Sequence, residues 1–219
     1  MKSHISNLNI GIFTIQESNF AKRGKLKINN FEIFEAIRTK AGGGTIVGAH
    51  LSLQPILIQE YSDSFELVVI EVNVGDKVIR VISGYGPQET WTTDLKMPFF
   101  MTLEEEISKA ELSGRSVIIC FDANSKMGRD HIPEDPHNIS ENGKVLEGIL
   151  RRHALTVANG IAGKHSGVIT RERITKDHIE RSVIDLVCLS EDLVECIDQI
   201  QIDEAKNYCL ESIKTPKKT

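Results

Sequence analysis

The sequence has no long hydrophobic segment, no closely spaced cysteines and no excess of positive charge. Its apolar runs fall far short of the ~20 residues that span a bilayer, and its N-terminus carries no apolar segment of the signal-peptide kind. The four cysteines show no C-x-x-C spacing, which favours buried thiols over metal ligands or disulfides. A net charge of −5 argues against a protein that coats nucleic acid through bulk electrostatics. We therefore expect an intracellular protein, nuclear or cytoplasmic, without a membrane partner.

What is present is the composition of a globular domain. Hydrophobic residues make up 40% of the 219 residues and charged residues 26%. No linker, repeat or low-complexity tract divides the chain, so we expect a single domain over residues 1–219. Three consecutive glycines, Gly42 to Gly44, permit a close backbone approach, but the G-x-G-x-x-G pattern of a nucleotide loop is missing.

Hydrophobic patterns predict many strands and two principal helices. Apolar, β-branched or alternating runs predict strands at 10–16, 31–37, 45–49, 65–72, 77–83, 116–121, 155–159, 167–170 and 182–190. Helical spacing predicts helices around 99–110, with Glu104 to Glu106 on the solvent side, and around 145–150. We also expect helical turns at 2–8, a charged loop before 182 and a final strand or helix at 194–202. So much sheet favours an α/β fold with two sheets packed face to face and helices outside.

One stretch stands out, an apolar run from Ser116 to Phe121 that leads into Asp122 and Asn124. A buried strand suits the β-branched run, and the polar residues mark the point where it leaves the core. Residues two apart on an extended chain share a face, so both polar side chains can point at one small object. An Asx turn at a strand end accounts equally well for the same residues.

Glu17, Tyr85 and Asp185 share this position at or near the ends of predicted strands. The ends of different strands can converge in a folded domain. Carboxylate and amide oxygens are hard ligands, and Mg²⁺ typically sits on one or two carboxylates together with water and phosphate. A tyrosine hydroxyl and an asparagine amide add neutral hydrogen bonds to phosphate oxygens or to an attacking water. Together these groups suit metal-assisted phosphoester hydrolysis.

A series of short motifs follows along the chain: Gln16-Glu17, Gly42-Gly43-Gly44, Tyr85-Gly86-Pro87, Phe121-Asp122-Ala123-Asn124, Asn142-Gly143-Lys144-Val145-Leu146, Thr170 and Ser182-Val183-Ile184-Asp185. In order and spacing the series resembles the endonuclease/exonuclease/phosphatase superfamily, and most of all the apurinic-type endonuclease domain of non-LTR retrotransposons. The resemblance covers most of the chain. It implies a DNase I-like, four-layer α/β sandwich in which two mixed β-sheets pack face to face with helices outside. The active site would lie at one edge of the paired sheets.

The resemblance also implies a role for each matching residue. Glu17 would bind the divalent metal, Mg²⁺ with Mn²⁺ as the alternative, and Tyr85 would contact the scissile phosphate. Asp122 would activate water or protonate the leaving oxygen, while Asn124 would hold the phosphate or the water. Asp185 would match the carboxylate that orients a catalytic histidine.

Three further residues are expected to contact phosphate or DNA. Thr170 would match a phosphate-contacting position of the family. Arg171 belongs to one of the local basic patches, and Lys126 follows the Asp122–Asn124 turn. For such basic residues a solvated loop is as good an explanation as a phosphate contact.

Two parts of the family pattern have no match in these 219 residues. They are a first strand with a metal-binding Asn and a terminal Ser-Asp-His that supplies the catalytic histidine. We therefore expect a truncated or degenerate copy, derived from a reverse transcriptase polyprotein and impaired in DNA cleavage, since each catalytic group is typically worth ~10²–10⁴-fold. The alternatives are a phosphomonoesterase of the same fold and an inactive remnant that serves as a binding module.

Overall fold

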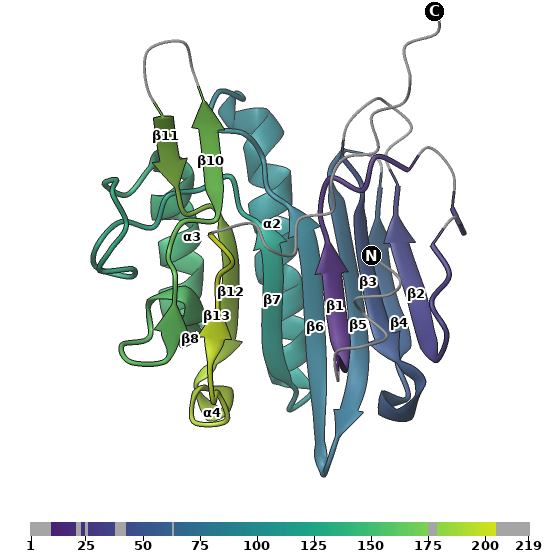
Figure 1. The fold of residues 1–219 in the computed structure, drawn as a ribbon. Coiled ribbons are helices and arrows are strands. Elements are labelled where there is room, and N and C mark those ends of the chain that lie inside the picture. The colour runs from purple at the N-terminus through teal and green to yellow at the C-terminus, as the bar shows by residue number, and fades with distance from the viewer. Residues whose placement is uncertain are drawn as a thin grey trace, which may run out of the picture.

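The computed structural model describes residues 10–20, 23–24, 26–37, 43–62, 64–174 and 179–204, and Figure 1 shows their arrangement. The helical turns expected at 2–8 lie outside this part of the chain. The strands are β1 (Ile12–Ile15), β2 (Phe31–Ala36), β3 (Thr45–His50), β4 (Ile56–Tyr61), β5 (Glu66–Val74), β6 (Lys77–Tyr85), β7 (Ser116–Asp122), β8 (Leu155–Val157), β9 (His165–Ser166), β10 (Arg171–Ile174), β11 (Ile179–Ser182), β12 (Asp185–Ser190) and β13 (Ile200–Gln201). The α-helices are α2 (Thr93–Leu112), α3 (Glu141–Arg152) and α4 (Glu191–Val194).

The larger sheet has six strands in the order β4-β5-β6-β7-β12-β8. Neighbouring strands are antiparallel except β6 and β7, which run parallel because α2 carries the chain across the sheet between them. β5 and β6 form a hairpin that turns at Gly75 and Asp76, with Val74 paired to Lys77. Because β12 runs antiparallel to β7, the beginning of β12 meets the ends of β6 and β7 at one edge of the sheet.

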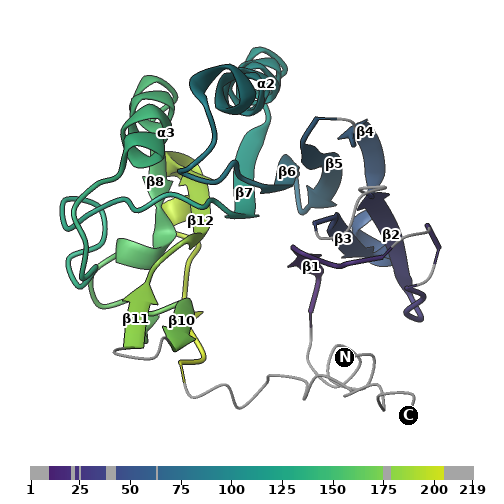
Figure 2. The same cartoon turned by 90° about the horizontal axis from the view of Figure 1, so that it is seen from above.

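The smaller sheet, β1-β3-β2, is antiparallel and packs face to face on the larger sheet (Figure 2). The core between the sheets includes Phe34 and Val47 from the smaller sheet and Val68, Ile70 and Val81 from the larger one. Alternate residues of a strand point to opposite faces, so these apolar side chains meet between the two layers. The prediction of an α/β protein with two sheets packed face to face is confirmed.

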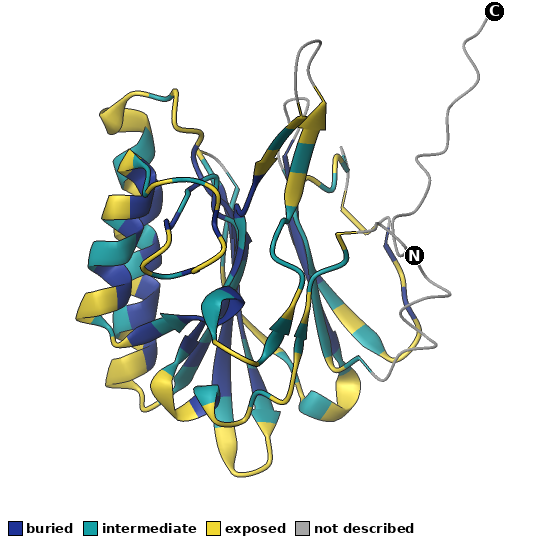
Figure 3. Cartoon of the chain, turned by 60° about the vertical axis from the view of Figure 1, so that its left-hand side comes forward, coloured by how far each residue is buried: buried dark blue, intermediate teal, exposed yellow. Residues whose placement is uncertain are grey.

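Helices α2 and α3 cover the other face of the larger sheet, with their buried sides turned toward the strands (Figure 3). Phe99, Leu103 and Ile107 of α2 and Leu146 and Ile149 of α3 are buried in this second core. Both predicted helices are therefore confirmed. Within the described ranges, the helical layer expected over the smaller sheet has no counterpart. No helix of the described chain has the length and apolar character needed to cross a membrane.

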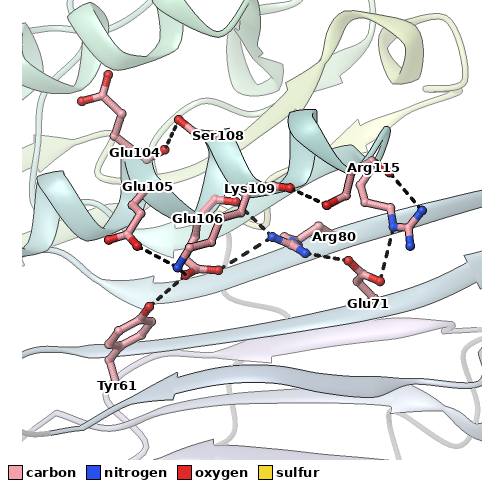
Figure 4. Close-up of polar contacts among 10 residues, drawn as sticks. Tyr61, Glu71, Arg80, Glu104, Glu105, Glu106, Ser108, Lys109 and Arg115 are labelled. Carbon is pink, nitrogen blue, oxygen red and sulfur yellow. Dashed lines mark hydrogen bonds and ion pairs between the residues drawn. The ribbon is translucent and has the colours of Figure 1, made fainter.

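The expected solvent position of Glu106 is wrong. Its side chain is 1% exposed and accepts hydrogen bonds from the Tyr61 hydroxyl at 2.9 Å and from Lys109 Nζ at 2.8 Å. At 100° per residue, Glu106 lies on the same face as Leu103 and is carried toward the sheet. Figure 4 shows the resulting network, in which Arg80 bridges α2 to Glu71 of β5 at 2.7 Å. Paired charges thus extend the helix–sheet interface beyond its apolar part.

The strand predicted at 167–170 and the charged loop after it are also wrong. The backbone N–H groups of Val168 and Ile169 donate to the carboxylate of Glu204, at 2.5 and 2.7 Å, instead of to a neighbouring strand. The charged segment forms the hairpin β10–β11, in which Arg171 pairs with Ser182. Both faces of this hairpin are largely exposed, so its sequence lacks the apolar alternation that marks a half-buried strand.

Candidate functional site

Three predicted site residues lie side by side across the larger sheet. Tyr85 at the end of β6 is in register with Asp122 at the end of β7, and Asp122 is in register with Asp185 at the start of β12. Residues opposite one another on paired strands project to the same face. The sheet register therefore gathers one phenol and two carboxylates at a single edge.

Glu17 reaches the same place from the smaller sheet. It is exposed, and its Oε1 accepts a hydrogen bond from the Tyr85 hydroxyl at 2.9 Å. Its backbone has φ 51°, a left-handed conformation that is uncommon for glutamate. The following residues hold this turn, because the N–H groups of Ser18 and Asn19 each donate to a glycine carbonyl, Gly44 and Gly43 respectively, at 3.0 Å.

The glycine run therefore supports the turn that carries Glu17. At Gly44 an added Cβ would stand 2.6 Å from Ser18 Oγ, and the backbone has φ 89°. A side chain at this position would meet both a steric and a conformational barrier. Close approach of the backbone, which the sequence suggests for Gly42 to Gly44, is observed for the described glycines of this run.

Asp122 and Asn124 form an Asx turn and line the site at the same time. The Asn124 N–H donates to Asp122 Oδ1 at 3.0 Å, and Asn124 takes up a left-handed conformation with φ 45°. Asn124 Nδ2 donates to the carbonyl of Gly86 at 3.0 Å, while the Gly86 N–H donates to the carbonyl of Asp122 at 2.7 Å. The two interpretations of these residues are therefore compatible, because the turn is what presents both side chains.

Asp185 is held from behind by Thr170 and Asn159. Thr170 Oγ1 accepts hydrogen bonds from the backbone N–H groups of Ile184 and Asp185, both at 3.0 Å, and its side chain also hydrogen-bonds the Asp185 carboxyl group. Asn159 Nδ2 donates to the Asp185 carbonyl at 3.0 Å. If Thr170 contacted phosphate, as the resemblance implies, it would use the same hydroxyl group that already positions Asp185.

These residues line one hollow of about 320 Å³. Its wall consists of Glu17, Tyr85, Gln88, Asp122, Asn124, Thr170, Arg171, Ile184 and Asp185. Two larger hollows, of about 600 and 790 Å³, lie away from these residues. Size does not single out the site. The convergence of carboxylates from both sheets does, because such groups repel one another unless protons or cations compensate them.

The electrostatics of the hollow reflect this crowding. Burial, reinforced by the charges of Asp185 and Glu17, raises the pKa of Asp122 to about 7. Burial also raises the pKa of Asp185, with the charge of Glu17 acting in the same direction. Arg171 is the one cation among the described lining residues, and its charge opposes both shifts. The pKa of Tyr85 is raised chiefly by burial, so its phenol stays protonated as a donor to Glu17.

The chemistry of these donors fits a hard cation. The three carboxylates that line the hollow offer oxygen ligands. That of Glu17 is exposed, and those of Asp122 and Asp185 lie close together beside it. The described part of the chain contains no cluster of three His, Cys, Asp or Glu side chains arranged to hold a metal ion on their own. One or two carboxylates can hold a divalent cation when water and substrate phosphate complete its shell.

Lys126 does not line the hollow. Its half-buried backbone instead joins the loop to the start of α3, with its N–H donating to Ser140 Oγ at 3.1 Å. Sequence reasoning assigned no role to Gln88, which lies within hydrogen-bonding reach of the Tyr85 phenol, or to Asn159. Gln88 follows the Tyr85-Gly86-Pro87 motif directly, and that position was its only signal. Asn159 ends a predicted strand, as the assigned residues do.

No protein-family model matches the sequence, and no curated protein sequence is significantly similar to it. Solved structures do match. The endonuclease domain of TRAS1, a telomere-specific non-LTR retrotransposon, has a TM-score of 0.58 at 18% identity, covering 88% of this chain and 78% of that one. The 3′-5′ exonuclease NExo from Neisseria meningitidis has a TM-score of 0.67 at 16% identity, covering 95% and 89%. An endonuclease/exonuclease/phosphatase family protein from Bacteroides thetaiotaomicron has a TM-score of 0.59 at 9% identity, covering 87% and 72%.

The chain has the fold of the endonuclease/exonuclease/phosphatase superfamily. The fold that the motif series implies is thereby confirmed. The identities are too low for these structures to carry more than the fold, so the role of each site residue stays a prediction.

Proposed function

We propose that this chain is a divalent-metal-dependent phosphodiesterase domain that cleaves DNA internally. The observation that carries the proposal is the convergence of Glu17, Tyr85, Asp122, Asn124 and Asp185, from strands of both sheets, around one hollow. Partly buried carboxylates with raised pKa values in a cleft, such as Asp122 and Asp185, mark candidate catalytic sites. The likeness to a retrotransposon endonuclease domain and to a 3′-5′ exonuclease supports the same reaction class.

Glu17 is the residue proposed to hold the cation, Mg²⁺ or Mn²⁺, because its carboxylate is exposed at the rim and oriented by Tyr85. A cation bound there supplies charge stabilisation for the phosphoryl group and the leaving oxygen. Arg171 lies on the same wall and supplies a fixed positive charge for the substrate phosphate.

Asp122 is the residue proposed to move a proton. A pKa of about 7 lets it accept a proton from the attacking water or return one to the leaving oxygen near neutral pH. The hydrogen bond to the Gly86 carbonyl fixes the side-chain amide of Asn124 beside Asp122. In this position the amide contacts a phosphate oxygen or the attacking water. Asp185 lies opposite Asp122, and its charge adds to the burial that raises the pKa of Asp122.

DNA is the substrate proposed, in the manner of a retrotransposon target-nicking domain that belongs to a reverse transcriptase polyprotein. The motif series and the likeness to TRAS1 support this choice. The exposed hairpin β10–β11 adds Arg173, which lies two residues beyond Arg171 on the same strand and so on the same face, where it suits a contact with a phosphate backbone.

The test is nicking of supercoiled plasmid DNA. We expect nicking with Mg²⁺ or Mn²⁺, loss with a chelator, and a fall of about 10²-fold or more for Asp122→Asn. Asp76→Asn, in the exposed β5–β6 turn, serves as the matched control and should leave the rate unchanged. Nicking that survives Asp122→Ala would sink the site assignment.

A phosphomonoesterase of the same fold is the second candidate. The hollow of about 320 Å³ has room for a terminal phosphate group, which favours this reaction as well. Release of inorganic phosphate from a 3′-phosphorylated oligonucleotide or a small phosphomonoester, without plasmid nicking, would select it. Cation binding by calorimetry with no turnover of either substrate class would select a binding module instead.

A further inference from the structure

Gln16 joins the two sheets directly beneath the proposed site. Its Nε2 lies 3.1 Å from Ser83 Oγ on β6 and 3.3 Å from the Cys120 carbonyl on β7. It also lies 3.2 Å from Thr14 Oγ1 on β1, the strand that Gln16 follows. Ser83 Oγ in turn stands 3.0 Å from Thr45 Oγ1 on β3. One side chain thus connects the smaller sheet to two neighbouring strands of the larger one.

This contact differs from the rest of the interface. The core between the sheets includes many apolar residues, such as Val47, Val68 and Val81, whereas Ser83 and Thr45 are both 0% exposed and hydrogen-bonded to each other. Buried hydroxyl groups are costly unless they are paired, so the network has one well-defined geometry. An apolar contact could slide, but a hydrogen-bonded bridge of this kind cannot slide without breaking.

The position of the bridge relates it to the chemistry. Gln16 immediately precedes Glu17, while Ser83 and Cys120 lie two residues before Tyr85 and Asp122 on their strands. Ser83 and Cys120 are themselves in register. On β6 and β7 the bridge therefore lies one same-facing residue before Tyr85 and Asp122, which line the hollow. It connects the segment that carries Glu17 to the strands that carry Tyr85 and Asp122.

We propose that Gln16 is a positioning residue that sets the placement of Glu17 relative to Tyr85 and Asp122. The inference deepens the proposed function and rests on it. Because Glu17 comes from a different sheet, no strand register fixes its position relative to Asp122. Gln16 supplies that restraint from below, and the Tyr85 hydroxyl supplies it from the side. A misplacement of about 1 Å is enough to cost on the order of 10²-fold in rate.

Gln16→Met tests the inference, because it keeps the length of the side chain and removes its hydrogen bonds. Tyr61→Phe is the matched control, since it removes one partly buried hydrogen bond of 2.9 Å to Glu106, away from the hollow. We expect both variants to lower Tm modestly. Only Gln16→Met should lower kcat, by about 10–100-fold, with KM for DNA unchanged.

A second readout does not depend on activity. The amide hydrogens of Ser18 and Asn19 bond to the carbonyls of Gly44 and Gly43, and hydrogen exchange reports how firmly the Glu17 turn is held. Gln16→Met should speed their exchange more than tenfold, whereas Tyr61→Phe should not. The affinity for Mn²⁺ by calorimetry should fall in the same variant.

Ser83→Ala completes the experiment. It removes one acceptor of the bridge, so we expect a smaller loss of kcat than for Gln16→Met. The double variant should lose no more kcat than Gln16→Met alone. If Gln16→Met matches Tyr61→Phe in exchange and in kcat, Gln16 is merely structural and the inference fails. If the wild-type protein does not nick DNA, the proposed function fails, and the exchange rates still decide the role of Gln16.

Discussion

Asp122 and Asp185 stand directly opposite each other on the antiparallel strands β7 and β12. Burial at this strand end, reinforced by the charges of Asp185 and Glu17, disfavours ionisation of Asp122 and raises its pKa to about 7. The arrangement stores unfavourable electrostatic energy in the folded protein. Local destabilisation of this kind is typical of sites that bind a cation or transfer a proton.

We predict that Asp122→Asn stabilises the metal-free protein at alkaline pH. A carboxyl group whose pKa is raised from its ordinary 3.8 to about 7 binds its proton more tightly in the folded state. Stability is therefore full below about pH 4 and falls as pH rises through about 7, a loss that asparagine avoids. We expect a gain of about 1–3 kcal/mol at pH 8 and none near pH 4, by urea unfolding with a chelator present.

Asp76→Asn provides the comparison, since Asp76 is an exposed residue of the β5–β6 turn. It should change the free energy of unfolding little at either pH. Equal stability of wild type and Asp122→Asn at pH 8 would contradict the crowding of charge described above.

A second prediction concerns Gly86, the first residue after Tyr85 at the end of β6. A Cβ at this position would stand 2.3 Å from the carbonyl oxygen of Ala123, a backbone atom that cannot rotate away. Gly86→Ala should therefore force β6 and β7 apart at the site, cost about 1–3 kcal/mol and lower nicking on the order of 10²-fold. Gly75→Ala meets only the strain of φ 63° in an open turn, so its Tm should fall while nicking persists.

The sequence was sufficient to predict the strand ends that carry Glu17, Tyr85 and Asp122. Each of these follows an apolar or alternating run, and a polar residue at such a boundary is visible without a structure. Asp185 lies inside the strand predicted at 182–190, whereas in the structure it begins β12. The two-sheet architecture followed from the number of such runs. The convergence itself depends on the register between β6, β7 and β12, which no local pattern specifies.

What the sequence could not show has a common physical cause, namely partners that are distant along the chain. Glu106 has the charge of a surface residue, but its partner Tyr61 lies 45 positions away. Gln16 and Ser83 are separated by 67 positions. Strand β4 was missed for another reason: Ile56, Leu57 and Ile58 are all exposed, so burial imposes no alternation on it.

The third prediction tests the network between α2 and the larger sheet. Glu106→Gln removes a buried charge that pairs with Lys109 and faces Arg80, so it should cost about 3 kcal/mol. Glu105 pairs with the same lysine at 2.8 Å but is 62% exposed. Glu105→Gln should therefore cost less than about 1 kcal/mol. A similar cost for both variants in urea unfolding would show that Glu106 is not the anchor of the network.

The same network makes a prediction at high pH. Burial, helped by the hydrogen bond to Glu106, raises the pKa of Tyr61 to about 12. A raised tyrosine pKa means that its stabilising contribution is complete below about pH 10 and is lost as pH rises toward 12. Absorbance at 295 nm should therefore show a late-titrating phenol that disappears in Tyr61→Phe, while the phenol of Tyr85, whose pKa is also raised by burial, remains. Titration of that phenol near its ordinary value of 10.0 would refute the assignment.

The last prediction separates substrate binding from chemistry at Arg171. This arginine is the one cation among the described residues that line the hollow, and it is exposed to an approaching phosphate. Arg171→Gln should weaken binding of duplex DNA and reduce the slope of log K against log salt by about 0.9. Arg23→Gln removes the same charge from an exposed arginine that pairs with Glu60, away from the hollow, and should leave the slope unchanged. Fluorescence anisotropy with a chelator present measures binding without cleavage. An equal change of slope in both variants would mean that net charge, and not the position of Arg171, governs the contact with DNA.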